Sequence, residues 1–384
     1  MIKIFNNKNF KLGVFLSYRS PEEGGGFTIT YDILNSILTA NIVKKHINFI
    51  ILNDKNHILK KKIIKAGFQC YELKDKYFLL KIKSFIFSLF PFLLKIYNFF
   101  NFNQYLNLQK KNKINTVWFL SAEYYYPLFS KYVSTVWDLQ HITHHKFPET
   151  GGFFRKIYRK HVIKNFLKKS YKIITGSNVL IEIIKKKYDI NRNKIIYNQH
   201  PTPSIFLKKP KERKKVNFKN YFLYPANFWQ HKNHLNLFEG FKNFNKKYNF
   251  KFKLILVGDI KDKLYFQKIN KHYLNDFKKN FIILKFVSIN KLINLYDHCL
   301  ALIYSSYAGP ENLPPLEAMA RKKPLICSNY PGAKEQLKKI PIYFNPNNPK
   351  SITKSLEKYL LSKKNKKYFV RKTEDYVLKV LNEI

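Results

Sequence analysis

The chain has 384 residues, of which 45% are hydrophobic, so it is long and apolar enough for two sizeable domains and is not a disordered protein. Its 71 Lys and Arg residues against 24 Asp and Glu residues give a net charge of +47, which by itself predicts a polyanion or an anionic membrane as partner. The lysines are dispersed and accompany a general excess of residues that A/T-rich codons encode, so we interpret part of this charge as compositional bias.

The three cysteines, Cys70, Cys299 and Cys327, show neither paired nor metal-ligand spacing, which fits a reducing compartment. Residues 1–8 lack the apolar core of a signal peptide, and we expect a cytoplasmic protein. Charges interrupt every stretch that could span a bilayer. The aromatic run 84–102 is compatible with two interpretations, a buried helix and an interfacial helix that touches the membrane.

Strands and helices alternate along the first half of the chain. Apolar runs predict strands, and apolar spacing at helical periodicity predicts helices. The predicted strands are 11–17, 47–52, 116–120, 134–137 and 172–175, and the predicted helices are 27–38 and one that follows Gly176-Ser177-Asn178 and runs to 188. Such alternation predicts a parallel α/β sheet.

A second α/β run follows the charged segment 206–216, which we interpret as an interdomain linker. Its predicted strands are 221–225, 252–257, 281–284, 300–304 and 324–327, and its predicted helices are 234–244, 289–296, 314–321 and the tail from 351 onward. The predicted domains are therefore 1–205 and 217–365, with a C-terminal helix in 366–384 that packs back toward the first domain. We expect a ligand cleft between the domains, at the carboxyl ends of the strands.

The segment 305–335 carries the most chemical information. After a strand that ends at Tyr304, Asn312 can cap a helix, and Pro314 and Pro315 suit the first turn of a helix because they lack N–H groups. The start of such a helix attracts anions. Glu317 near this end has two interpretations: a favourable first-turn charge, or a ligand-binding carboxylate.

This segment resembles the nucleotide-binding signature of family 4 retaining GT-B glycosyltransferases. The run Leu313–Ala320, LPPLEAMA, matches the second half of that signature, and Pro324–Ile326 matches the strand after it. In the family, the second of two glutamates binds the ribose hydroxyls, and the resemblance implies this role for Glu317.

The first glutamate of the signature, which contacts the donor sugar in the family, is absent. Gly309 stands in its place, eight residues before Glu317, and Glu311 is two positions out of register. The resemblance therefore implies that the donor sugar is held near Gly309 and Glu311 and by backbone amides around Asn312 and Leu313.

The second segment of the resemblance is 224–234, YPANFWQHKNH. The family places an arginine and a lysine five residues apart here, and both neutralise the donor diphosphate. Lys232 matches the lysine, whereas Asn227 stands at the arginine position and brings no charge. A plain capped and solvated turn is the alternative.

The third segment, 136–145 (VWDLQHITHH), resembles the Asp-x-x-His stretch of the family, in which the histidine lies beside the donor sugar. The resemblance implies this catalytic role for His141. A metal site with His144 and His145 is a weaker alternative because no acidic or cysteine partner accompanies the histidines. An ordinary loop histidine is the third.

The glycines Gly24, Gly25 and Gly26 precede the first predicted helix. Glycines let a backbone approach a ligand closely, but this run does not fit the dinucleotide fingerprint, and a plain turn is the alternative. In the family, a glycine loop at this place faces the cleft, which implies donor contacts for Gly25 and Gly26.

Together these matches imply an α/β GT-B fold with two Rossmann-like domains facing each other across a cleft. They imply retaining, metal-independent transfer of a hexose from a GDP- or UDP-sugar to a saccharide or lipid-linked acceptor in surface polysaccharide biosynthesis. No cofactor and no metal are expected. We expect peripheral contact with the inner face of the cytoplasmic membrane, and no nucleic acid. The alternatives are a basic nucleic-acid-binding protein, an epimerase of the same fold and an inactive scaffold.

Overall fold

The computed structural model describes residues 9–17, 24–40, 44–52, 57–121, 125–126, 128–208, 217–274, 277–362 and 368–384. Most of the predicted linker (209–216) and the predicted boundary at 365–366 lie outside these residues, as do residues 1–8. The chain divides into two compact units, which are described separately. Unit 1 takes its residues from Met1–Thr143, Gly151–His200 and Lys372–Ile384, and unit 2 from His144–Thr150 and Pro201–Arg371.

Unit 1 is built on a seven-stranded parallel sheet with the order β3-β2-β1-β4-β5-β6-β7. Its strands are β1 (Leu12–Leu16), β2 (Ile47–Leu52), β3 (Gln69–Leu73), β4 (Thr116–Phe119), β5 (Tyr132–Val136), β6 (Lys172–Thr175) and β7 (Ile195–Tyr197). Every residue of β1, β2, β4 and β5 is buried. Such continuous apolar strands are typical of parallel sheets that helices cover on both faces.

Except for α17, which follows unit 2 in the chain, the helices of unit 1 connect successive strands. They are α1 (Gly25–Thr39), α2 (His57–Lys65), α3 (Tyr77–Leu89), α4 (Pro91–Phe99), α5 (Gln104–Lys111), α6 (Gln140–Thr143), α7 (Phe153–Tyr158), α8 (Lys164–Lys169), α9 (Asn178–Tyr188) and α17 (Thr373–Glu383). A π-helical turn, Arg159–Ile163, joins α7 to α8.

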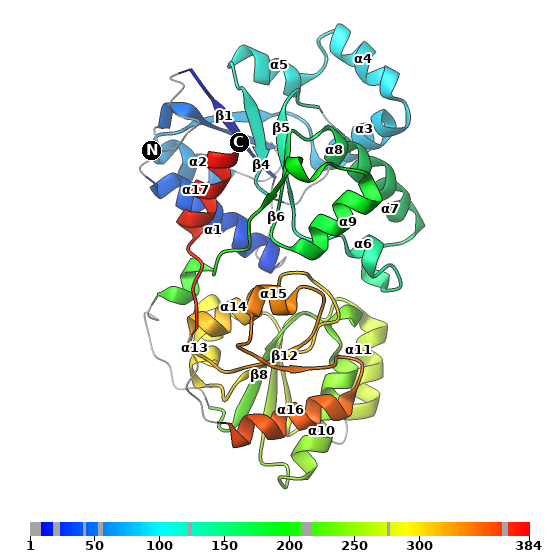
Figure 1. Ribbon diagram of the computed structural model, residues 1–384, viewed down its shortest axis with the longest axis vertical. Coiled ribbons are helices and arrows are strands. Elements are labelled where there is room, and N and C mark those ends of the chain that lie inside the picture. Colours follow the sequence, from blue (N-terminus) through cyan, green and yellow to red (C-terminus); the bar gives the residue numbers. More distant parts are fainter. Residues whose placement is uncertain are drawn as a thin grey trace. The chain divides into compact units, whose positions relative to one another are not determined.

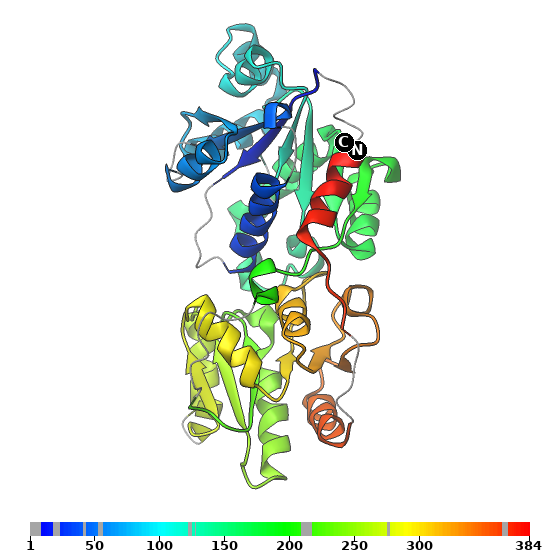
Figure 2. The ribbon, with the colours of Figure 1, turned by 90° about the vertical axis from the view of Figure 1, so that its left-hand side faces the viewer.

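The last helix returns to the first. In Figures 1 and 2, α17 (red) runs beside α1 (blue). The hydroxyl of Thr373 donates to Asp32 Oδ2 on α1 (3.0 Å), and Asn198 Nδ2 donates to the carbonyl of Tyr376 (3.0 Å). The C-terminal segment therefore completes the core of unit 1, although it follows unit 2 in the chain.

Unit 2 is built on a six-stranded parallel sheet with the order β10-β9-β8-β11-β12-β13. Its strands are β8 (Tyr221–Pro225), β9 (Lys253–Val257), β10 (Phe281–Leu284), β11 (Leu302–Tyr304), β12 (Leu325–Ser328) and β13 (Ile342–Phe344). Its helices are α10 (His234–Lys246), α11 (Lys263–Ile269), α13 (Ile289–His298), α14 (Leu313–Ala320), α15 (Ala333–Leu337) and α16 (Pro349–Leu361).

The predicted α/β class with two Rossmann-like sheets is confirmed. Strands β3, β7 and β13 were missed: β7 and β13 are only three residues long, and β3 reads QCYEL, which lacks an apolar pattern. The predicted linker starts too early, because Phe206 is 1% exposed and packs edge-on against Tyr296 at a ring-centroid distance of 5.5 Å within unit 2. His144–Thr150, which we expected in the first domain, groups with unit 2.

The interpretation of 84–102 as a buried helix is wrong. This run forms parts of two helices, α3 and α4, and no residue of α4 is buried. Among the described residues no single helix is both long and apolar enough to cross a bilayer, whereas α3 and α4 taken together pass that test with a bend of 115° between them.

Candidate functional site

A polar cluster lies at the carboxyl edge of the unit 2 sheet, where the loops after β8 and β11 meet. Lys232 Nζ donates to the hydroxyl of Tyr304 (2.9 Å) and to Asn312 Oδ1 (3.5 Å). The Tyr304 hydroxyl in turn donates to Asn312 Oδ1 (2.6 Å). The carboxyl edge of a parallel sheet is where α/β proteins bind ligands, so this cluster is the candidate centre of the site.

The two loops that carry the cluster are joined by their own hydrogen bonds. The hydroxyl of Ser305 donates to the carbonyls of Lys232 (3.3 Å) and Asn233 (3.1 Å), and the hydroxyl of Ser306 donates to the carbonyl of His231 (3.2 Å). The amide of Tyr307 also donates to the carbonyl of His231 (2.8 Å). These contacts hold the backbone that carries Lys232 in one position relative to β11.

Gln336 on α15 holds the third member of the cluster. Its side chain is fully buried, its Oε1 accepts from the Asn312 amide (3.0 Å) and from the Tyr330 hydroxyl (2.7 Å), and its Nε2 donates to the Asn312 carbonyl (2.8 Å). A buried amide that is satisfied on both sides orients its partner firmly. Asn312 is therefore fixed from behind by a residue 24 positions further along the chain.

Glu317 lies in α14 behind the same loop and is 8% exposed. Burial raises the pKa of its carboxyl to about 7, even though a hydrogen bond from the Tyr296 hydroxyl to its Oε2 (2.7 Å) acts in the opposite direction. A carboxyl with this pKa is about half ionised at neutral pH. Glu317 can therefore change its charge in response to a bound ligand or to pH.

Gly309 occupies a backbone position that other residues adopt only with strain, since its φ is +102°. A Cβ at this position would lie 2.8 Å from Asn312 Oδ1 and 2.9 Å from its Nδ2, and the Gly309 carbonyl accepts from that Nδ2 (3.0 Å). The side chain of Asn312 therefore fills the space that a longer residue at 309 would need. Glu311 is half-buried.

The expectation that the Asn312 side chain caps a helix is wrong. Asn312 is the residue before α14, but its side chain makes no capping hydrogen bond and turns instead to Tyr304, Lys232 and Gly309. The backbone amide of Asn312, which we expected to bind the donor sugar, donates a hydrogen bond to Gln336 Oε1.

Asn227 follows β8, and its Oδ1 accepts from the amide of Asp259 after β9 (2.8 Å). The two loops approach so closely that a Cβ at Gly258 would lie 2.3 Å from the carbonyl of Ala226. Asn227 thus joins the ends of β8 and β9, and its side-chain oxygen is used within the fold.

Unit 1 carries the other predicted site residues at the carboxyl edge of its own sheet. Gly25 and Gly26 open α1 after β1, and Gly24 before them has a φ of +68°. His141 lies on α6 after β5, with its Nε2 3.5 Å from the hydroxyl of Tyr188. Burial, and then the nearby charge of Arg159, lower the pKa of His141 to about 4, so its ring is neutral at pH 7.

The segment His144–Thr150, which belongs to unit 2, packs next to the loop that carries Lys232. Glu149 Oε1 accepts from the His231 amide (2.8 Å) and pairs with His231 Nδ1, while the ring of Phe147 stacks on that of Tyr307 with centroids 5.8 Å apart. Burial alone would raise the pKa of Glu149, but the hydrogen bonds from the side chain and the amide of His231 outweigh it and hold that pKa below its usual value.

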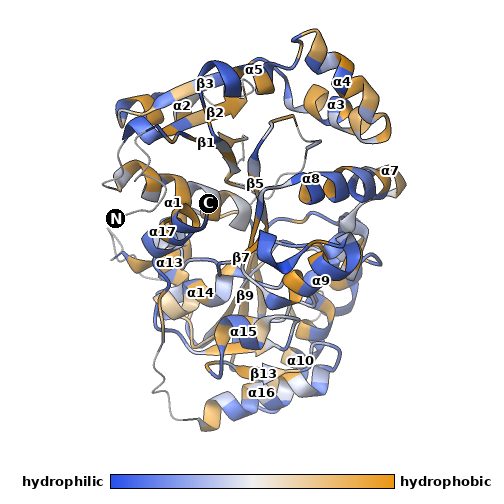
Figure 3. Ribbon diagram, turned by 45° about the horizontal axis from the view of Figure 1, so that its top comes forward, coloured by the Kyte–Doolittle hydropathy of each residue, from blue (hydrophilic) through white to orange (hydrophobic). Residues whose placement is uncertain are grey.

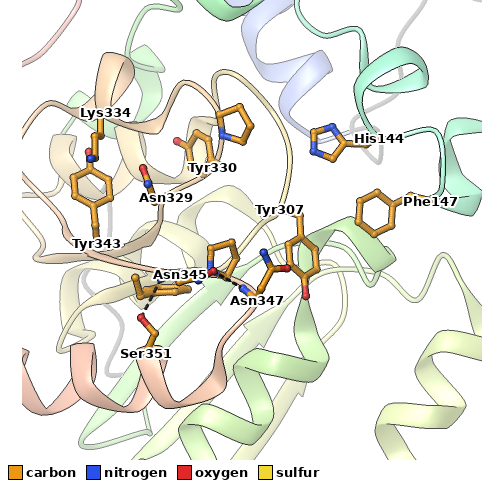
Figure 4. A pocket seen from close by; sticks show the side chains of 13 residues that line it. His144, Phe147, Tyr307, Asn329, Tyr330, Lys334, Tyr343, Asn345, Asn347 and Ser351 are labelled. Atoms are coloured by element: carbon orange, nitrogen blue, oxygen red, sulfur yellow. Dashed lines mark hydrogen bonds between the residues drawn. The ribbon is translucent and has the colours of Figure 1, made fainter.

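A cavity of about 910 Å³ lies beside this segment, at the ends of β12 and β13 (Figure 4). Phe147 and Tyr307 face it from one side, Lys334 and Tyr343 from the other, and Asn347 below. Its described lining contains no acidic side chain. Tyr307, which lines it, donates its amide to the carbonyl of His231, the residue before Lys232, whereas Lys232, Asn312 and Glu317 do not line the cavity.

Within the described ranges, His, Cys, Asp and Glu side chains form no group of three that could hold a metal ion. His141 and His144, which we had considered together as metal ligands, fall into different units.

Sequence reasoning missed Tyr304, Gln336, Tyr296 and Glu149 as members of the site. Tyr304 and Tyr296 are strand and helix residues whose apolar character signals burial, and only the structure shows what their hydroxyls contact. Glu149 and His231 are 82 residues apart, and no local pattern links them.

The two parallel Rossmann-like sheets define the GT-B fold, and comparisons with solved structures agree. A glycosyltransferase from Rickettsia africae has a TM-score of 0.61 with 16% identity, over 97% of this chain and 92% of that one. Alr3699/HepE from Anabaena, solved in complex with UDP and glucose, has a TM-score of 0.61 with 11% identity, over 97% of each chain. At these identities the likeness establishes the fold alone.

The sequence comparison with known families concerns mainly unit 2. Residues 207–376 match the family described as "Glycosyl transferases group 1", so the resemblance to family 4 GT-B glycosyltransferases is confirmed over this region. The O-antigen chain mannosyltransferase RfbU of Salmonella typhimurium is 31% identical over 228 residues, which cover 59% of this chain. The chain spans about 60% of the length of that relative.

Gly309 stands where the signature described above has its first glutamate, and a substitution there tests whether this position tolerates a side chain. We expect Gly309→Ala to lower the stability by about 1–3 kcal/mol and to displace Asn312, because the left-handed backbone and the close amide both disfavour a side chain. Gly152→Ala is the matched control, since a Cβ there meets nothing within 4 Å. Thermal unfolding of both variants measures the difference, and equal midpoints would contradict the steric argument.

Proposed function

We propose that this protein is a retaining glycosyltransferase that moves a hexose from a GDP- or UDP-sugar to a growing saccharide or a lipid-linked acceptor in surface polysaccharide biosynthesis. The observation that carries this proposal is the cluster of Lys232, Tyr304 and Asn312 at the carboxyl edge of a domain of the glycosyltransferase family. The likeness to an O-antigen mannosyltransferase supports the polysaccharide context.

In the proposed reaction Lys232 stabilises the leaving diphosphate. Its ammonium group donates to the hydroxyl of Tyr304 and to Asn312 Oδ1, and these two contacts orient it. As the bond between the anomeric carbon and the phosphate oxygen breaks, negative charge grows on that oxygen, and a preoriented cation stabilises it. This role needs no bound metal, which is part of the proposal.

Glu317 is proposed to bind the ribose of the donor. Tyr296 donates to Oε2, and a ribose hydroxyl would donate to the other oxygen. Binding of such a donor favours the ionised carboxylate, whose pKa burial has raised to about 7. Glu317 would thus become charged as the nucleotide fills the site.

The acceptor hydroxyl is proposed to attack the anomeric carbon from the side of the leaving group. Its oxygen forms the new glycosidic bond, the bond to the diphosphate breaks, and the proton passes to the leaving phosphate oxygen. His141, neutral at pH 7, suits a hydrogen-bonding role toward the sugar rather than an electrostatic one. Gly25 and Gly26 at the start of α1 are proposed to face the donor.

We further propose a cytoplasmic enzyme that works peripherally at the inner face of the membrane, where lipid-linked acceptors are found. The net charge of +47 supports attraction to anionic lipids. The nucleic-acid alternative is not favoured, because the family match accounts for unit 2, and the epimerase alternative is not favoured by the likeness to a transferase.

A thermal-shift screen against UDP, GDP, ADP and CMP, with single-stranded DNA as control, tests this proposal. A nucleoside diphosphate present at about 100 times its dissociation constant is expected to stabilise the protein by about 2.7 kcal/mol. The responding nucleotide also identifies the base of the donor. A stabilisation by DNA alone that disappears with added salt would refute the glycosyltransferase proposal.

A further inference from the structure

Unit 1 exposes a concentrated apolar surface on α3, α4 and the start of α7. Of the 25 large apolar side chains that are exposed among the described residues, 11 lie between Phe78 and Phe102, and Phe153 and Phe154 add two more. Phe99 is 80% exposed and Phe154 is 85% exposed. Exposed apolar side chains that are scattered singly need no explanation, but a contiguous group marks an interaction surface.

The elements of this surface are held together as one face. On α3, Leu80 and Phe87 are buried against unit 1, which anchors the helix, and the ring of Phe85 stacks on that of Tyr158 at the end of α7 with centroids 6.1 Å apart. Figure 3 shows α3 and α4 as mostly orange, hydrophobic ribbon, with α7 nearby. We call the exposed side chains of 78–102 and 153–154 the apolar face.

Basic residues outnumber acidic residues in the segments that carry the apolar face. The range 77–102 contains three lysines, of which Lys83 pairs with Asp75 just before α3 (2.9 Å), and the range 153–169 contains seven lysines and arginines. Neither range contains an aspartate or a glutamate. Exposed aromatic rings can enter the apolar interior of a bilayer, and neighbouring basic side chains attract anionic headgroups. This combination suits an anionic lipid surface.

The lengths of the helices indicate how such a surface would be engaged. With 13 and 9 residues, α3 and α4 are roughly 20 Å and 14 Å long, shorter than the hydrocarbon core of about 30 Å. Their bend of 115° also prevents them from forming one continuous span. They fit a position in the interface, parallel to the membrane.

A second copy of the chain is a less suitable occupant for the apolar face. In a two-fold dimer the same face meets itself, so the lysines and arginines around it would meet like charges. Bringing these like charges together would oppose the association.

We propose that the apolar face docks unit 1 on an anionic phospholipid bilayer, with Phe92, Phe99 and Phe154 inserted below the headgroups and Arg155 and Lys156 at the phosphates. This rests in part on the proposed function, since it brings the enzyme to a lipid-linked acceptor. The start of α3 follows β3, and Gly25 and His141 follow β1 and β5. Because the strands are parallel, all three lie at the same edge of the sheet, so the apolar face begins at the edge that carries Gly25 and His141.

Vesicle co-sedimentation of the full chain tests the docking. We compare vesicles of phosphatidylcholine with vesicles that also contain about 30 mol% phosphatidylglycerol, a typical anionic surface. The variant Phe92→Ser/Phe99→Ser/Phe154→Ser removes three exposed rings and is expected to lower the partition coefficient on the anionic vesicles at least 30-fold, roughly, from the loss of buried apolar area.

The matched control removes three equally exposed apolar side chains from unit 2. These are Leu264 (79% exposed), Phe286 (61%) and Leu361 (87%), each replaced by serine. The control is expected to bind vesicles as the wild type does. Because all six positions are exposed, both triple variants should fold. The double variant Arg155→Gln/Lys156→Gln gives a second readout: it keeps every aromatic ring and is expected to bind the anionic vesicles more weakly.

Several results would overturn the docking. They are unchanged binding of the triple-phenylalanine variant, equal losses in both triple variants, and equal wild-type binding to both kinds of vesicle. If the wild type instead self-associates in light scattering and does not bind vesicles, and the phenylalanine variant no longer self-associates, then the apolar face binds a second copy of the chain. The nucleotide thermal shift of the same proteins keeps the two proposals apart: vesicle binding without any nucleotide response rejects the glycosyltransferase, and the docking stands.

Discussion

Replacing Lys232 by methionine is expected to lower kcat/KM for sugar transfer by about 10²–10³-fold, the size of effect seen when one preoriented stabilising donor is removed from an active site. Methionine keeps most of the apolar stem but removes the ammonium group that donates to Tyr304 and Asn312. The loss should appear mainly in kcat, because the charge on the leaving phosphate develops only as the bond breaks.

Lys242→Met is the control for this experiment. Lys242 lies on α10, is partly exposed and pairs with Glu239, outside the cluster. It should retain wild-type kinetics, and the melting temperatures of both variants should stay close to that of the wild type. Wild-type turnover by Lys232→Met would remove this residue from the proposed mechanism.

Glu317→Gln is expected to weaken donor binding by about 10-fold at pH 8, the loss of roughly one charge-assisted hydrogen bond. The difference from the wild type should shrink at pH 6, because the wild-type carboxyl, with a pKa of about 7, is then mostly protonated. Titration calorimetry with the nucleotide identified in the thermal-shift screen, repeated at several pH values, measures this. A pH-independent difference would show that the ionisation of Glu317 is not coupled to the donor.

The raised pKa of the Glu317 carboxyl also predicts how the stability of the folded protein depends on pH. Its pKa is about 7 in the folded protein against 4.5 for the ordinary group, so its contribution to stability is complete below pH 4.5 and is lost as the pH rises through 7. The loss is at most about 3 kcal/mol. Glu317→Gln cannot ionise and should therefore be the more stable protein at pH 8, by comparison of unfolding midpoints. Glu357→Gln, at an exposed ion pair, serves as the control.

Tyr296→Phe tests how the hydrogen bond from Tyr296 sets the pKa of Glu317. This variant removes the hydroxyl that donates to Oε2 of Glu317 and leaves the carboxyl itself in place. Since that hydrogen bond lowers the pKa of Glu317, its loss should shift the midpoint of the pH-dependent binding upward. A shift downward would contradict this account of the buried carboxyl.

The sequence by itself determined the parts of the protein that depend on local signals. Alternating apolar runs and helical spacing predicted strands such as 172–175, 221–225 and 281–284 with the bounds that the structure has. The run LPPLEAMA and the family it resembles were also recognisable, because the spacing of its residues in the chain is the spacing along one helix. Local propensity and periodicity are properties of neighbouring residues, and these are what a sequence displays.

Only the tertiary structure decided the contacts between distant segments. Gln336 behind Asn312, Glu149 on His231 and Thr373 on Asp32 join residues 24, 82 and 341 positions apart. The same holds for exposure: 84–102 has a composition suited to burial, but α4 packs only one side against the core, through the partly buried Leu93, Leu94 and Tyr97, and none of its residues is buried. Burial and hydrogen bonding depend on which segments meet in space, and that is settled by the packing of the whole fold rather than by any one segment.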